Sequence, residues 1–299
     1  MGMKHLTHCA IIFISFQLML CSVESVEDPF DNACVLSETS VCITETVPPD
    51  IDNLESVAST VYDVILVMGQ SNTLGGLGYD SILDKSSSRI FQLGRRANDM
   101  KVIEAKEPLD HHESISGRIG FALTFCKWYA STLLDSGRNI LIIPCGMGST
   151  GFTDQRWNRG DDLYEDAVSR TKYVLSQFPG SDLKTILWHQ GEDDIDNPEF
   201  QRALDSMIVN FRMDLHTQSI VPFILGGMVP YWSDQSEARR YSECVLQTTP
   251  TRIPATAFVD PGFPCRIAKI DNSVDEIHFN AEGQRELGFR YFNVYRSFH

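Results

Sequence analysis

The chain has 299 residues, of which 42% are hydrophobic and 22% are charged. This composition is typical of a globular protein and excludes disordered, collagen-like and coiled-coil classes. The 40 acidic and 25 basic residues give a formal net charge of -15, which would repel nucleic acid and other polyanions. We therefore expect one domain of catalytic size that does not bind nucleic acid.

The first residues have the pattern of a secretory signal peptide. Lys4 precedes an apolar run from Cys9 to Cys21, and small or polar residues follow at 22–25. An uncleaved membrane anchor is the alternative, but this run of 13 residues is shorter than the ~20 that a spanning helix needs. We expect residues 1–25 to be a signal peptide, the protein to be secreted or to reside in the secretory-pathway lumen, and no membrane anchor to be present.

Removal of the signal peptide would leave an even number of cysteines: Cys34, Cys42, Cys126, Cys145, Cys244 and Cys265. In a secreted chain this indicates disulfides, although many pairings are possible. Two local pairs are plausible on spacing, Cys34 with Cys42 and Cys244 with Cys265. The other two cysteines lie in segments predicted as core, where buried free thiols are the alternative. No cysteine pair has zinc-ligand spacing with histidines, so we predict no metal site.

Two regions follow the signal peptide. Residues 26–60 are acidic and rich in Ser, Thr and Glu, and we expect an extended N-terminal segment there. From residue 61 to the end, short apolar runs alternate with helical patterns. Continuous apolar runs are typical of strands that are covered on both faces. The predicted strands lie at 61–68, 139–145, 184–188, 220–225 and 255–259.

Helices are predicted between these strands, at 117–134, 163–178, 200–215, 233–244 and from 280 onward. Asn197 and Pro198 predict the start of the third of them. Alternating strands and helices favour a parallel sheet with helices on both faces, whose functional residues follow the strands at their carboxyl ends. Residues 72–116 interrupt the alternation, and we interpret them as a long insertion that contains a hairpin.

A candidate nucleophile follows the first predicted strand. Ser71 lies in the sequence Gly69-Gln70-Ser71-Asn72, where a tight turn can lift its hydroxyl out of the sheet. A helix after this turn would direct its positive end at the serine. The alternative is that Ser71 and Asn72 serve as helix-capping residues.

A base and an acid follow the fifth predicted strand. A serine hydroxyl needs a base to take its proton, and the base needs a carboxylate to hold its tautomer. His278 and Asp275, three residues apart, supply both; a loop histidine and a surface carboxylate are the alternatives. Glu192 also follows a strand and could orient His278, but the short Asp275–His278 segment loses less chain entropy in folding back.

Acyl transfer also needs hydrogen-bond donors for an oxyanion. The second strand runs into a glycine-containing turn at 145–151, and the third runs into Gln190. The N–H groups of Ser71 and Gly148 and the side-chain amide of Gln190 are the candidates. A plain turn and a structural amide are the alternatives for the latter two.

Five motifs occur in order along the chain: "GQSN" at 69–72, "EPLDHH" at 107–112, "GST" at 148–150 with Trp157 downstream, "WHQGE" at 188–192 and "DEIH" at 275–278. Together they resemble the blocks of the SGNH (GDSL-like) hydrolases. Within that superfamily they resemble the sialate O-acetylesterase and plant carbohydrate acetylesterase branch, carbohydrate esterase family six. The resemblance covers roughly residues 60 to 296, and ordered blocks are far more specific than any single one.

The resemblance implies a flavodoxin-like, three-layer α/β/α sandwich with five parallel strands. It also implies a nucleophile at Ser71, a base and acid at His278 and Asp275, and oxyanion donors in the glycine turn and at Gln190. The usual glycine pair of that turn is Gly148-Ser149 here, which leaves open which backbone N–H donates.

Four residues in or near these motifs are assigned to substrate binding: Gln70, Asn72, Trp157 and Glu192. Bracing of the oxyanion turn is the alternative for Glu192. We thus expect a secreted serine esterase that removes acetyl or other short acyl groups from carbohydrates without a cofactor. An inactive carbohydrate-binding protein and a lipid esterase or thioesterase are the alternatives. Sialic acid, xylan and pectin esters all fit as substrates, although the net charge disfavours anionic polymers.

Overall fold

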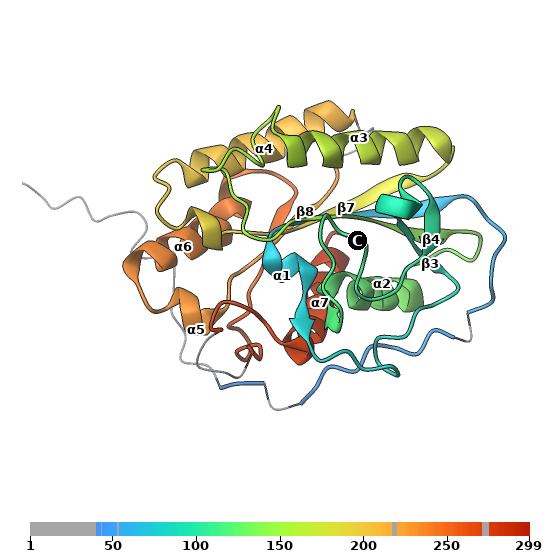
Figure 1. Ribbon diagram of the computed structural model, residues 1–299, viewed down its shortest axis with the longest axis horizontal. Coiled ribbons are helices and arrows are strands. Elements are labelled where there is room, and N and C mark those ends of the chain that lie inside the picture. The colour runs from blue at the N-terminus through green and yellow to red at the C-terminus, as the bar shows by residue number, and fades with distance from the viewer. Residues whose placement is uncertain (1–39, 43, 53, 217–219, 271–274) are drawn as a thin grey trace, which may run out of the picture.

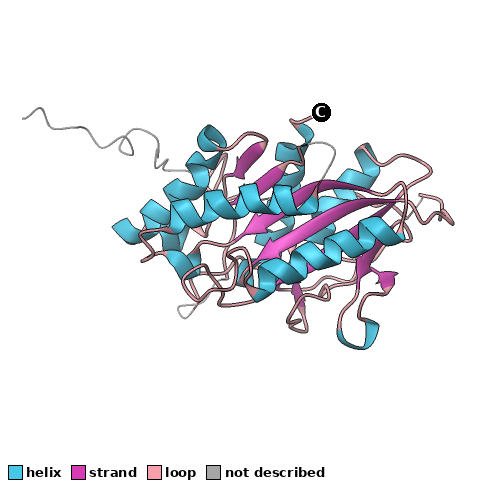
Figure 2. Cartoon of the chain, turned by 90° about the horizontal axis from the view of Figure 1, so that it is seen from above, coloured by secondary structure: helices cyan, strands magenta, loops and turns pink. Residues whose placement is uncertain are grey.

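The computed structural model describes residues 40–42, 44–52, 54–216, 220–270 and 275–299. The predicted signal peptide and Cys34 lie outside these residues. A central sheet is covered by helices on both faces, as Figure 1 shows from the side and Figure 2 from above. The predicted three-layer α/β/α class is therefore confirmed. No helix in the described part of the chain is long and apolar enough to cross a membrane.

The central sheet has seven strands in the order β4-β3-β6-β1-β7-β8-β9. Their bounds are Tyr62–Gly69 (β1), Ile90–Leu93 (β3), Val102–Glu104 (β4), Asn139–Gly146 (β6), Asp182–His189 (β7), Phe223–Gly226 (β8) and Thr256–Val259 (β9). β1 lies between β6 and β7 and is parallel to both. Every residue of β1 and β6 is buried, because helices cover both faces of the sheet.

The five predicted strands are the contiguous set from β6 to β9, but the prediction of five was too small. The insertion supplies two more: β3 pairs in parallel with β6, and β4 pairs antiparallel with β3. A short separate ladder joins β2 (Gly76–Leu77) to β5 (Arg118–Ile119). The insertion is therefore a hairpin that extends the sheet, because its apolar residues complete the buried edge beside β6.

Helices α3 (Asp162–Gln177) and α4 (Phe200–Leu215) cover one face of the sheet, and α2 (Phe121–Thr132) and α7 (Ala281–Arg296) cover the other (Figure 1). The remaining helices are α1 (Ser71–Leu74), α5 (Pro230–Ser233), α6 (Glu237–Arg252) and the 3-10 turns η1 (Arg96–Asn98) and η2 (Glu192–Asp194). α6 packs against α4 and β9.

Two predicted helix starts are wrong. α4 begins at Phe200 after Glu199, because the Asn197 amide donates to Asp194 and its oxygen accepts the Glu199 N–H, forming a turn before the helix. α6 begins after Ser236, whose hydroxyl accepts the Arg239 N–H as a helix N-cap.

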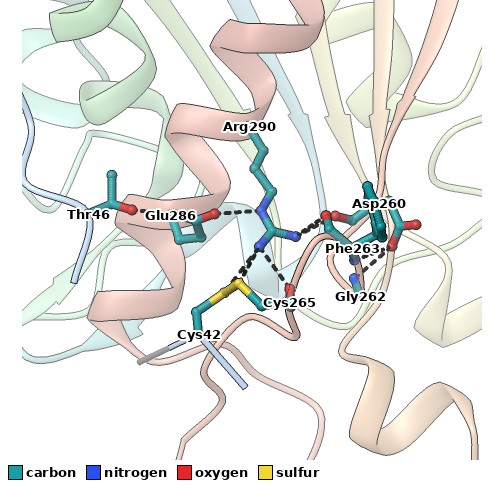
Figure 3. Close-up of a disulfide and its surroundings, with 8 residues drawn as sticks. All are labelled: Cys42, Thr46, Asp260, Gly262, Phe263, Cys265, Glu286 and Arg290. Atoms are coloured by element: carbon teal, nitrogen blue, oxygen red, sulfur yellow. Dashed lines mark hydrogen bonds and ion pairs between the residues drawn. A yellow bond between two sulfur atoms is a disulfide. The ribbon is translucent and has the colours of Figure 1, made fainter. Parts of the chain in front are cut away.

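The N-terminal segment is attached to the domain by a disulfide between Cys42 and Cys265, 223 residues apart in sequence. Beside it, Arg290 of α7 donates to the carbonyls of Asp260 and Cys265, at 2.7 and 2.8 Å (Figure 3). A β-bridge between Val41 and Arg266 continues the contact.

Both predicted local disulfide pairs are therefore wrong. The extended segment returns to the last loops of the domain, so Cys42 meets Cys265 instead of a sequence neighbour. Cys244 is also disulfide-bonded. Cys126 and Cys145 are buried free thiols, which confirms the alternative interpretation for the core cysteines.

Candidate active site

The turn after β1 places Ser71 at the first position of α1. Gly69 has φ 132°, and a Cβ there would lie 2.1 Å from the backbone oxygen of His189. Only glycine combines this backbone conformation with so close an approach of β7. The turn therefore brings the end of β1 against the end of β7 and leaves Ser71 partly exposed beyond the sheet.

Ser71, His278 and Asp275 form a continuous hydrogen-bonded series. The Oγ of Ser71 lies 2.8 Å from Nε2 of His278, and Nδ1 of His278 lies 2.9 Å from Oδ2 of Asp275. Oδ1 of Asp275 also accepts the backbone N–H of His278 at 3.1 Å. The loop thus folds back on itself as expected, and His278 contacts Asp275 and not the alternative acid Glu192 in the described residues.

Asn72 connects this loop to the serine turn. Its Nδ2 donates to the carbonyl of Ile277 at 2.9 Å, and its Oδ1 accepts the N–H of Phe279 at 3.1 Å. The same Nδ2 donates to Oε1 of Glu192 at 2.7 Å. Asn72 therefore holds the residues on both sides of His278, and Glu192 holds Asn72.

The four residues assigned to substrate binding are buried in the structure, and their contact with substrate stays a prediction. The exposed fractions of these residues are 1% for Gln70, 0% for Asn72, 0% for Trp157 and 5% for Glu192. The Trp157 Nε1 donates to the hydroxyl of Thr150, and the Gln70 side chain accepts the N–H of Asp193. These hydrogen bonds join the side chains to residues of the turns that follow β6 and β7.

Two of the predicted oxyanion donors, the N–H of Gly148 and the amide of Gln190, already have hydrogen-bond acceptors within the protein. The N–H of Gly148 donates to Oε1 of Glu113 at 2.7 Å. The buried amide of Gln190 donates to Oδ2 of Asp194 at 2.7 Å, which leaves one of its two N–H groups for another acceptor. Ser149 has φ 51°, a left-handed backbone conformation that glycine adopts more readily than serine.

Sequence reasoning missed Glu113 and Asp194. Asp194 also accepts the backbone N–H groups of Phe152 and Thr153, so it joins the turn after β6 to the turn after β7. Glu113 directly follows the motif "EPLDHH", and Asp194 lies two residues after "WHQGE", so proximity to these motifs was the available signal.

Carboxylates dominate the electrostatics around the serine. Burial raises the pKa of Glu192 to about 7. Burial and, next, the nearby Asp154 and Asp194 raise the pKa of Asp193. Burial also lowers the pKa of His189 to about 3, so this histidine is neutral and structural. The described residues contain no group of three or more His, Cys, Asp or Glu side chains that could hold a metal ion.

The raised pKa of Glu192 predicts a pH-dependent stability. The folded state retains the Glu192 proton up to about pH 7, whereas the unfolded chain releases it near the ordinary value of 4.5. The free energy of unfolding should therefore fall by about 3 kcal/mol as pH rises through this window. Denaturant unfolding at about pH 5 and about pH 8 should show a smaller decline for Glu192→Gln than for the wild type. Equal declines would contradict the assignment.

Residues 61–297 match the family described as "Carbohydrate esterase, sialic acid-specific acetylesterase". A probable carbohydrate esterase of Arabidopsis thaliana is 30% identical over 253 residues, covering 78% of this chain and 90% of that protein. A probable 9-O-acetyl-N-acetylneuraminic acid deacetylase of Escherichia coli (strain K12) is 26% identical over 230 residues, covering 60% and 70%.

Solved structures agree on the fold. The crystal structure of NanS matches with a TM-score of 0.71 and 21% identity over 81% of this chain and 98% of that one. An Arabidopsis thaliana protein matches with a TM-score of 0.63 and 27% identity over 79% and 98%. The match of the family to nearly the whole described domain shows that the chain belongs to the carbohydrate esterases of the sialic acid-specific acetylesterase family, which are carboxylic ester hydrolases.

Proposed function

We propose that the protein hydrolyses O-acetyl esters of carbohydrates, with Ser71 as nucleophile, His278 as base and Asp275 as acid. The observation that carries this proposal is the series Ser71–His278–Asp275, with spacings of 2.8 and 2.9 Å, at the carboxyl end of the sheet. The names of the relatives, a carbohydrate esterase and an acetylneuraminate deacetylase, support the substrate class.

Acylation begins at the serine hydroxyl. Ser71 Oγ attacks the ester carbonyl carbon while its proton passes to Nε2 of His278, and a tetrahedral intermediate forms. The imidazolium is stabilised by Asp275 at Nδ1. Collapse of the intermediate breaks the bond to the sugar oxygen, which takes the proton from His278, and leaves an acetyl ester on Ser71.

Deacylation repeats these steps with water. His278 removes a proton from a water molecule that attacks the acetyl carbonyl, and the second tetrahedral intermediate collapses with return of the proton to Ser71 Oγ. Acetic acid leaves and the starting state is restored. All groups that move protons belong to the chain, so the proposed cycle includes no cofactor.

Donors for the oxyanion are proposed at the N–H groups of Ser71 and Gly148 and at the amide of Gln190. Gln190→Ala should lower kcat about 10²- to 10³-fold with little change in KM, since an oxyanion donor acts mainly in the transition state. Steady-state kinetics should be paired with a thermal unfolding scan, because Gln190 also donates to Asp194. An unchanged kcat with lowered stability would assign Gln190 to structure alone.

The decisive test of the proposal is acetate release from a panel of acetylated glycans. The panel should include O-acetylated sialic acid, acetylated xylan, acetylated pectin and neutral acetylated monosaccharides, with acetyl and octanoyl nitrophenyl esters beside them. Release of acetate from sugars supports the proposal. Preference for octanoyl esters would indicate a lipid esterase, and glycan binding without acetate release would indicate a binding protein.

We also propose that the protein is secreted. The Cys42–Cys265 disulfide supports this, because such bonds form and persist in oxidising compartments. Expression with the native N-terminus should yield protein in the medium whose N-terminal sequence starts near residue 26. Retention of an intact N-terminus inside the cell would contradict it.

A further inference from the structure

The loop after β4 is aligned along the glycine turn that follows β6. Nδ1 of His111 accepts the N–H of Gly146 at 2.9 Å, and the N–H of His112 donates to the carbonyl of Gly146 at 3.1 Å. Two residues further along the turn, the N–H of Gly148 donates to Oε1 of Glu113 at 2.7 Å. Consecutive residues of the loop thus meet the end of β6, and the last contact is made by a carboxylate.

The hydrogen bond from Gly148 to Glu113 is incompatible with the role of the Gly148 N–H as an oxyanion donor. The oxyanion of the tetrahedral intermediate needs the Gly148 N–H, and a carboxylate now occupies it. A negative charge beside the developing oxyanion would also destabilise the transition state by repulsion. Glu113 must therefore leave Gly148 before this donor can act.

The side chain of Glu113 is free to leave without unfolding the loop. Among the residues that the structure describes, its carboxylate has no other hydrogen-bond partner or ion pair. The backbone before it is anchored at His111 and His112, and Nε2 of His112 also lies 3.1 Å from Asp166. Residues 114–117 beyond it are exposed. Rotation about the side-chain bonds of Glu113 is therefore sufficient.

A carboxylate that leaves a backbone N–H needs a new donor of similar strength. Water supplies one for any substrate, but a carbohydrate ester also carries hydroxyl groups next to its acetyl group. An aryl acetate carries none. The exchange of the Glu113 hydrogen bond from Gly148 to a substrate hydroxyl would thus favour sugar esters over simple esters.

We propose that Glu113 is a specificity-determining residue. In the free enzyme it occupies the Gly148 N–H, and on binding it moves to accept a hydrogen bond from a sugar hydroxyl, which releases the donor for the oxyanion. Recognition of the sugar is thereby coupled to completion of the oxyanion site. This inference rests on the proposed function and adds the group on the substrate that the site recognises.

The test compares kcat/KM for an acetylated monosaccharide and for 4-nitrophenyl acetate. Glu113→Ala should raise the value for the aryl ester about tenfold and lower or leave unchanged the value for the sugar ester, since one charge-assisted hydrogen bond is removed from the resting state. Glu113→Gln keeps a neutral acceptor and should shift the ratio less. Labelling of Ser71 by an organophosphonate, whose oxygen occupies the oxyanion position, should also accelerate in Glu113→Ala.

Glu165→Ala is the matched control. Glu165 is exposed on α3. Like Glu113, it accepts the N–H of a glycine, that of Gly160, at 3.1 Å. This variant should leave the substrate ratio unchanged. Parallel losses for both esters in Glu113→Ala and Glu113→Gln, or no change in the ratio, would overturn the role of Glu113 alone. A wild-type protein that hydrolyses neither ester and is not labelled at Ser71 would overturn the proposed function and this inference together.

Discussion

Replacement of Ser71 by alanine is expected to lower the rate of acetate release by about 10³-fold or more. The reason is geometric, because the Ser71 hydroxyl lies 2.8 Å from the imidazole that takes its proton, and no second hydroxyl is placed in that position among the described contacts of His278. The substitution removes only a small group at a partly exposed position, so the fold should be retained. Acetate release and organophosphonate labelling of the purified variant measure the effect.

A serine outside the site controls for nonspecific effects. Ser176 is exposed on α3 and donates to the carbonyl of Tyr173, three residues earlier in the same helix. Ser176→Ala should therefore retain wild-type turnover and labelling. Turnover near the wild-type level in Ser71→Ala would remove Ser71 from the mechanism and with it the proposed acyl-enzyme.

The second large effect is expected at the acid. Asp275→Asn should lower kcat by about 10⁴-fold, because an amide cannot stabilise the imidazolium and favours the wrong tautomer. Both carboxylate oxygens lie within 3.0 Å of Nδ1 of His278, so the loss falls directly on the base. Steady-state kinetics on the purified variant measure this effect.

Glu192→Gln is the matched comparison, since Glu192 contacts Asn72, which in turn holds the described part of the histidine loop at Ile277. An amide at position 192 can still accept the Asn72 hydrogen bond, so the loss of kcat should be far smaller than at Asp275. A larger loss at Glu192 than at Asp275, in folded variants, would transfer the acid role to Glu192.

The local pattern of the sequence was sufficient to predict the layered fold and to select the candidates for the triad. Apolar runs predict the buried strands because burial on both faces requires continuous apolar residues, and β1 and β6 follow this rule throughout. The carboxyl ends of parallel strands meet at one edge, so residues that follow different strands could be grouped before any coordinates. Ser71 meets the Asp275–His278 loop at this edge, although Ser71 and His278 are 207 residues apart in sequence.

The contacts made by individual side chains were decided only by the tertiary structure. Trp157 follows a glycine turn in the sequence, but its indole is fully buried because the turn folds over the sheet edge. Cys42 bonds to Cys265 because the N-terminal segment returns to the last loops of the domain, and spacing carries no information about that return.

The same reasoning applies to the sheet size and to the oxyanion turn. The sequence by itself determined the approximate positions of the five central strands and of the helices between them, since these depend on local burial and hydrogen-bonding patterns. The tertiary structure decided that the hairpin of β3 and β4 joins β6 and that Glu113 meets the Gly148 N–H. Such pairings depend on which distant surfaces compact packing brings together, and no local pattern of residues records that.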